Sequence, residues 1–185
     1  MYNMALFAAE LTEGERRQKY AEMAASIKAD MHQHLWMKRK GMFAYCQDLR
    51  GNRLLHTEPE LPDVYHPAEM GLVDDFHIYQ MLDWVEGNLP HEDTPGGGRI
   101  YWSSNWHPNT ADSYTHSTYE LALAEQLNLA MIYQQIGLAE EGYQIFKATY
   151  NAVFGGDVSD VFDHNLDQYI EKSMLPTVLE TAGGI

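Results

Sequence analysis

The spacing of apolar residues predicts a chain built mainly of helices. From Tyr20 to Leu35, apolar side chains recur every three or four positions, which predicts a helix over residues 13–38. The sequence TEGE at 12–15 has the form of a capping box with Thr12 as the N-cap. Because charged positions are frequent along it, this helix has the character of an exposed one.

The remaining pattern predicts four further helices and one small β element. Residues 42–55 alternate between apolar and polar side chains and contain a turn, which predicts a β-hairpin excursion. Helices are expected at 66–72, 74–88, 113–136 and 138–153, of which 113–136 is the most apolar and is expected to be buried. A long loop is expected at 90–112. The tail, 157–185, is less regular, with a candidate helix at 163–173.

The lengths of the connections indicate how these helices are arranged. Long segments, 39–65 and 89–112, lead into the short helix at 66–72 and the buried helix at 113–136. The link that leaves the buried helix, at Gly137, is minimal. In a layered helical array, this alternation collects the long loops on one face, beside the N-terminal ends of the inner helices. We therefore expect one all-α domain over residues 1–185.

Composition narrows the classes of partner. The 185 residues carry a net charge of −15, from 27 acidic and 12 basic residues. Binding to nucleic acid or to an anionic membrane needs a basic surface, so neither is expected, whereas a neutral or cationic ligand is compatible. Cys46 is the only cysteine, which excludes an internal disulfide. No signal peptide or membrane-spanning stretch is recognised, and the localisation stays open.

The loop sequence GRIYWSSNWHP at 98–108 is the most unusual stretch of the chain. Aromatic rings offer flat apolar area for the C–H faces of a sugar, and amide, imidazole and indole N–H groups bond its hydroxyls. The expected sugar-binding residues are Tyr101, Trp102, Asn105, Trp106 and His107. The alternative is that both tryptophans simply pack the loop onto the helices.

Several stretches resemble a known family of carbohydrate-active proteins. The helix up to Leu35, followed by Trp36, GMFAY at 41–45 and Asp48, resembles glycoside hydrolases with an (α/α)6 toroid, also called six-hairpin, fold. YHPAEMGLVDDFHIYQM at 65–81, WSSNW at 102–106 and GLAEEGY at 137–143 are similar to a gut-bacterial branch of toroid proteins related to these hydrolases. The resemblance covers about residues 12–155 and roughly two of the six outer–inner helix pairs.

This resemblance implies an incomplete all-α toroid-type array that binds a neutral oligosaccharide or polysaccharide and hydrolyses a glycosidic bond. Such hydrolysis uses two carboxyl groups across the scissile bond. Glu69 and Glu120 are the expected catalytic pair, because both fall near the N-terminal ends of inner helices. The other candidate acids are Glu58, Glu60, Asp63, Asp74 and Asp75. The resemblance alone suggests a periplasmic or extracellular location.

No cofactor or metal is expected. His66 with Glu69 and His116 with Glu120 have helical spacings that could hold a metal, but no HExxH motif is present. Two other readings stay open: a non-catalytic helical module that binds a glycan or protein through the aromatic loop, and a partial array that associates with another copy or with the rest of a toroid.

Overall fold

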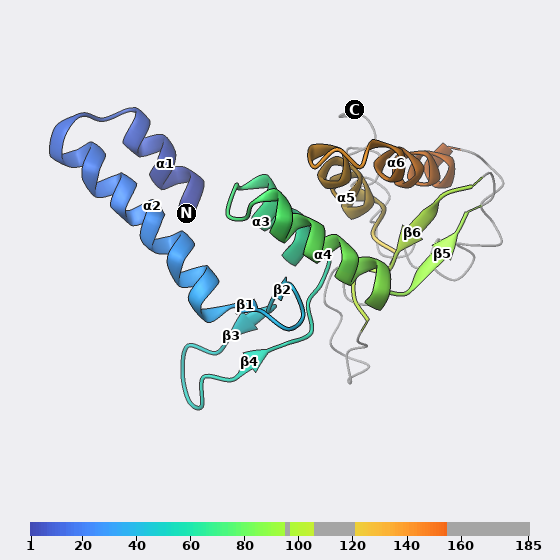
Figure 1. Cartoon of the computed structure of the whole chain (residues 1–185), viewed down its shortest axis with the longest axis horizontal. Helices are drawn as coiled ribbons and strands as arrows, with labels where there is room; N and C mark the ends of the chain where they lie inside the picture. The colour runs from blue at the N-terminus through green and yellow to red at the C-terminus, as the bar shows by residue number, and fades with distance from the viewer. Residues whose placement is uncertain (95–96, 106–120, 155–185) are drawn as a thin grey trace.

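A computed structural model describes residues 1–94, 97–105 and 121–154 of the chain (Figure 1). The helices in this part are α1 (Tyr2–Glu10), α2 (Gly14–His34), α3 (Pro62–Glu69), α4 (Asp75–Asn88), α5 (Leu123–Gln135) and α6 (Ala139–Phe154). The strands are β1 (Trp36–Met37), β2 (Met42–Phe43), β3 (Cys46–Gln47), β4 (Leu55–His56), β5 (His91–Asp93) and β6 (Arg99–Tyr101), paired as three antiparallel ribbons. The mainly helical class expected from the sequence is confirmed.

A helical hairpin of α1 and α2 stands at one end of the molecule (Figure 1). Helix α1 was not predicted, and the predicted capping box is wrong. The Thr12 hydroxyl donates to the Ala8 carbonyl, 2.7 Å away, and α2 begins without a side-chain cap. Helix α2 is as exposed as expected, with Ala24 its one fully buried residue. Lys28 Nζ and His32 Nε2 attach it to the main-chain carbonyls of Gly71 and Leu72.

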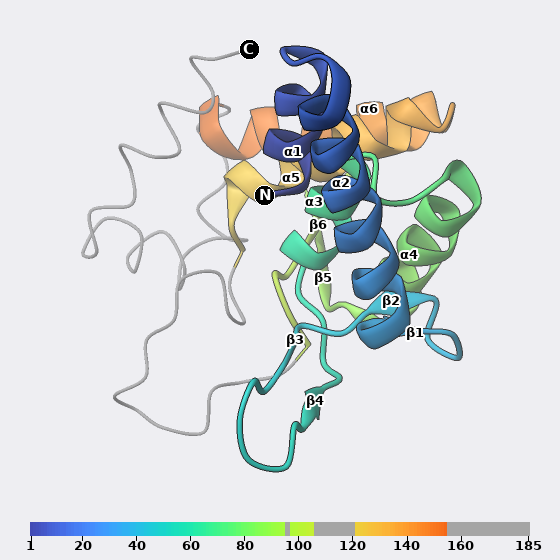
Figure 2. The same cartoon turned by 90° about the vertical axis from the view of Figure 1, so that its left-hand side faces the viewer.

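Two short ribbons follow α2 and replace the last turn of the predicted helix. The helix ends at His34 because Trp36 and Met37 pair with Phe43 and Met42. The second ribbon joins β3 to β4 and confirms the predicted excursion at 42–55. It projects below the helices in both views (Figures 1 and 2).

Helices α3 and α4 lie in the middle of the molecule. The predicted helix at 66–72 begins earlier, at Pro62, and ends before Gly71, whose positive φ of 69° ends the helical path. Helix α4 begins where predicted, because the carboxylate of Asp74 accepts the N–H of His77 at 2.9 Å and caps the first turn.

Helices α5 and α6 pack closely against each other. The prediction of one continuous helix over 113–136 is wrong at Ala122, whose backbone is extended, so α5 begins at Leu123. Residues 113–120 and the candidate helix at 163–173 lie outside the described residues. Helix α6 confirms the prediction at 138–153. Gly142 permits the close approach of the two helices, because a Cβ there would lie 2.7 Å from the Ala130 carbonyl oxygen.

The two long connections meet beside the N-terminus of α3. The N–H of Leu61 donates to the carbonyl of Ser103 at 2.9 Å, and Glu60 forms an isolated antiparallel bridge with Ser104. The core beneath combines side chains of β2, α3, α4, β6, α5 and α6. Within the described ranges, no helix has the length and apolar character needed to cross a membrane.

Candidate functional site

The first half of the aromatic motif forms a strand instead of a loop. Residues 99–101 are strand β6, which pairs with β5 in the register His91 to Tyr101 and Asp93 to Arg99. The prediction of an irregular loop over 90–112 is therefore wrong for its first part. The turn of this hairpin closes through Thr94, whose N–H and hydroxyl both donate to the carbonyl of Gly98.

A buried glutamine fixes strand β6 against helix α5. Gln126 is fully buried, and its side-chain amide makes two hydrogen bonds with the main chain of Tyr101. Its Oε1 accepts the N–H of Tyr101 at 2.9 Å, and its Nε2 donates to the carbonyl of Tyr101 at 2.8 Å. The amide therefore makes the two main-chain hydrogen bonds that a neighbouring strand would make, and it fixes the position of Tyr101.

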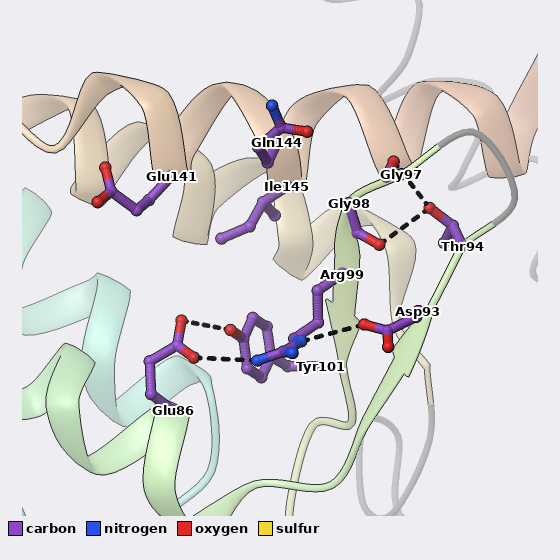
Figure 3. Close-up of a pocket in the computed structure, with 10 residues that line it drawn as sticks. All are labelled: Glu86, Asp93, Thr94, Gly97, Gly98, Arg99, Tyr101, Glu141, Gln144 and Ile145. Carbon is purple, nitrogen blue, oxygen red and sulfur yellow. Dashed lines mark hydrogen bonds and ion pairs between the residues drawn. The ribbon is translucent and has the colours of Figure 1, made fainter.

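Three donors converge on the carboxylate of Glu86, near the end of α4, and Figure 3 shows two of them, Tyr101 and Arg99. The hydroxyls of Tyr101 and Tyr133 both donate to Glu86 Oε1, the second at 2.8 Å. Arg99 lies 3.4 Å from Glu86 Oε2 and 3.3 Å from the carboxylate of Asp93, so it bridges the two acids. Burial, reinforced by the charge of Glu86, raises the pKa of both tyrosines, so both remain hydroxyl donors.

Glu86 stands in the wall of two clefts. The first, with a volume of about 350 Å³, lies between the β5–β6 hairpin and α6 and contains Asp93, Arg99, Glu141 and Gln144 (Figure 3). The second, with a volume of about 570 Å³, combines residues of both long connections with the end of α4. Its lining includes Arg39, Lys40, Glu58, Asp83, Trp84, Asn88 and Asn105. Both clefts offer hydrogen-bond donors and acceptors side by side.

The predicted sugar-binding residues take different positions around this carboxylate. The ring of Tyr101 is only 2% exposed, so it holds Glu86 in place and offers no stacking face. Trp102 is half-buried, with its indole N–H 3.4 Å from the carboxylate of Glu92. Asn105 is exposed in the second cleft. Trp106 and His107 lie outside the described residues.

Of the two predicted catalytic glutamates, Glu69 alone falls within the described part of the chain. Glu69 is on the exposed side of α3, 3.9 Å from Nδ1 of His66, and neither cleft beside Glu86 includes it. Glu120 lies outside the described residues. Across the described ranges, no three His, Cys, Asp or Glu side chains gather as they would around a metal ion.

Four of the other candidate acids have identifiable contacts, and the fifth, Asp75, is exposed in the first turn of α4. Glu58 accepts from Lys40 at 3.0 Å, and Asp74 caps α4. Glu60 is buried at the junction of the two connections, and Asp63 accepts the N–H of Glu60 at 2.9 Å. Glu86 was not among the residues singled out from the sequence, because its donors lie 13 to 47 positions away along the chain.

Comparison with protein-family models, curated proteins and solved structures finds no match for this chain.

Proposed function

We propose that the chain is a carbohydrate-active domain that binds a neutral oligosaccharide in the clefts beside Glu86. The observation that carries this proposal is the carboxylate itself, held by two tyrosine hydroxyls and an arginine in the wall shared by both clefts. A sugar hydroxyl both donates and accepts hydrogen bonds, so it needs a fixed acceptor beside fixed donors. Glu86 is the acceptor, and Arg99, Lys40 and Asn105 supply donors.

The arrangement of the helices supports a toroid-type array as the framework of this site. Helices α3 and α5, which we take as inner helices, contact each other. The long connections that precede them meet at Leu61 and Ser103. In a toroid-type array, long connections lead into the inner helices and short ones lead out of them, which places the sugar site on the face where the long connections meet. We propose this framework as part of a larger toroid, completed by further chain or by association with another copy.

The binding proposal is tested by titrating the protein with a panel of neutral oligosaccharides, following tryptophan fluorescence and the heat of binding. Glu86→Gln keeps the shape of the side chain but weakens its hydrogen bonds, and Asn105→Ala removes a donor from the second cleft. Both are expected to weaken binding at least tenfold. Glu10→Gln, on the distant and exposed α1, is the matched control. A folded protein that binds no member of the panel refutes the proposal.

Glycosidic bond hydrolysis is the second function we propose for this domain. Three carboxylates, those of Glu86, Asp93 and Glu141, line one cleft (Figure 3). A pair of carboxyl groups flanking the bond is what glycoside hydrolysis requires. Glu69 and Glu120 remain the pair expected from the resemblance, so both sets have to be compared in one assay.

The assay is the release of reducing ends from those oligosaccharides that bind. Glu86→Gln and Glu141→Gln are expected to abolish turnover if the cleft beside α6 is catalytic. Glu69→Gln and Glu120→Gln are expected to abolish turnover if the pair implied by the family resemblance is catalytic. A wild-type protein that binds sugar without turnover would overturn hydrolysis and leave the binding proposal intact.

A further inference from the structure

A third cavity lies away from Glu86, between α2 and α3. Its volume is about 300 Å³, and most of its wall is apolar. Met31 of α2, Leu35 just after this helix, Phe43 of β2, and Leu72 form this wall, while Met1 and Tyr2 at the start of α1 also line it. An apolar hollow of this size accepts a ligand with one compact ring or a short branched chain.

Asp63 supplies the one carboxylate among the described residues that line this mainly apolar cavity. Asp63, in the first turn of α3, lines the cavity, and its Oδ2 accepts the N–H of Glu60 at 2.9 Å. Burial raises the pKa of this carboxyl to about 6, which shows that water solvates its charge poorly. At neutral pH the carboxylate is still ionised, so a cation that reaches it gains a strong, partly desolvated partner.

The groups around Asp63 indicate the charge of the ligand. Among the described residues that line the cavity, none is Lys or Arg, and the cationic groups that line it are the α-amino group of Met1 and the imidazole of His66, whose charge acts to lower the pKa of Asp63. The negative charges of Glu60 and Asp63 raise the pKa of the neighbouring Tyr45 hydroxyl. His66 also lines the cavity, and it lies 3.9 Å from the carboxylate of Glu69. An anion would meet the negative charge of Asp63, and a neutral apolar molecule would desolvate that carboxylate further without supplying a counter-charge.

We propose that this cavity binds a small arylalkyl amine, with its ring between α2 and α3 and its ammonium group at the Asp63 carboxylate. Phe43 and Tyr45 supply aromatic edges for the ring, and Asp63 supplies the counter-charge. Because protonation of the Asp63 carboxyl removes the counter-charge, binding strengthens as the pH rises through about 6.

The test uses 2-phenylethylamine as the probe and 2-phenylethanol as its neutral analogue, titrated at pH 7.5 by calorimetry and by NMR. The amine is expected to bind one site per chain, and at least tenfold more tightly than the alcohol. Asp63→Asn should remove this preference while its amide oxygen still accepts the N–H of Glu60. Asp75→Asn, in the first turn of α4, is the matched control and should change nothing.

A second variant fills the cavity from the exposed helix. Met31 lines the cavity and packs against the edge of the core, so Met31→Trp is expected to abolish binding of both probes, and a cooperative urea unfolding curve shows that the variant is folded. Equal affinity for amine and alcohol, an unchanged Asp63→Asn variant, or no binding at millimolar amine would each overturn the proposal. Neither Asp63 nor Met31 lines the clefts beside Glu86, so oligosaccharide binding by the same variants reports separately on the proposed function.

Discussion

Gly98→Ala is the substitution that most directly tests how the site is assembled. Gly98 has a φ of 102°, a conformation that residues with a Cβ avoid. A methyl group there would lie 2.5 Å from the carbonyl oxygen of Gln144 and 2.8 Å from the Cβ of Ala148. Both contacts involve helix α6, so the β5–β6 hairpin would have to move away from it.

The expected loss of stability has two parts. The backbone strain of a side chain at positive φ is roughly 1–2 kcal/mol, and forcing a methyl group into a packed contact adds about 1–3 kcal/mol. For Gly98→Ala we therefore expect a loss of about 2–5 kcal/mol. Gly97→Ala separates the two parts, because Gly97 also has a positive φ, of 89°, but a Cβ there meets nothing within 4 Å.

The assay is urea unfolding of the two variants and the wild type, followed by tryptophan fluorescence. Gly97→Ala should lose only the strain contribution, and Gly98→Ala should lose at least about 1 kcal/mol more. Because Arg99 and Tyr101, one and three positions after Gly98, hold Glu86, Gly98→Ala should also weaken oligosaccharide binding. Equal losses of stability in the two variants would refute the close approach of the hairpin to α6.

Three other outcomes are expected. Tyr133→Phe removes the 2.8 Å hydrogen bond to Glu86 and should lower the free energy of unfolding by about 1 kcal/mol, seen as a lower urea midpoint without a change in slope. Since the pKa of Asp63 is raised to about 6, the folded state binds its proton more tightly than the unfolded state, so stability should fall as pH rises from about 4 to 6 and then level off. Asp63→Asn should abolish that slope in unfolding curves recorded across this range. Oligouronates should bind more weakly than neutral oligosaccharides of equal length in calorimetry, because three carboxylates face one arginine in the cleft of Figure 3.

The parts of the fold that the sequence predicted are those decided by local signals. Helix α4 has a capping aspartate and an apolar face, and α6 begins two residues after Gly137, which has a φ of 85°. The end of α2 was placed too late because the pairing of Trp36 with Phe43, a contact between separate segments, competes with the helical periodicity. Thr12 fits the capping pattern, yet its hydroxyl bonds the preceding helix, which the pattern does not represent.

The candidate site was predicted less well, because its centre is defined by contacts between distant residues. Glu86 has no unusual neighbours along the chain, and its importance follows from Tyr101 and Tyr133, which reach it from β6 and α5. A periodic pattern shows which face of a helix is apolar, but it does not show which polar residue two other elements will meet. Asn105, one of the predicted ligand contacts, is exposed in the second cleft, although the two serines before it are buried.

The described residues of the aromatic motif do not share one structural role. Strand β6 ends at Tyr101, so the residues before and after that point meet different surroundings. Tyr101 is fixed by Gln126 and in turn fixes Glu86, whereas Trp102 and Asn105 lie in the segment that leads to the junction with Glu60 and Leu61. One short stretch therefore connects the buried support of the carboxylate to the clefts on either side of it. A substitution in the strand should alter the orientation of Glu86, and a substitution at Asn105 should alter ligand contact alone.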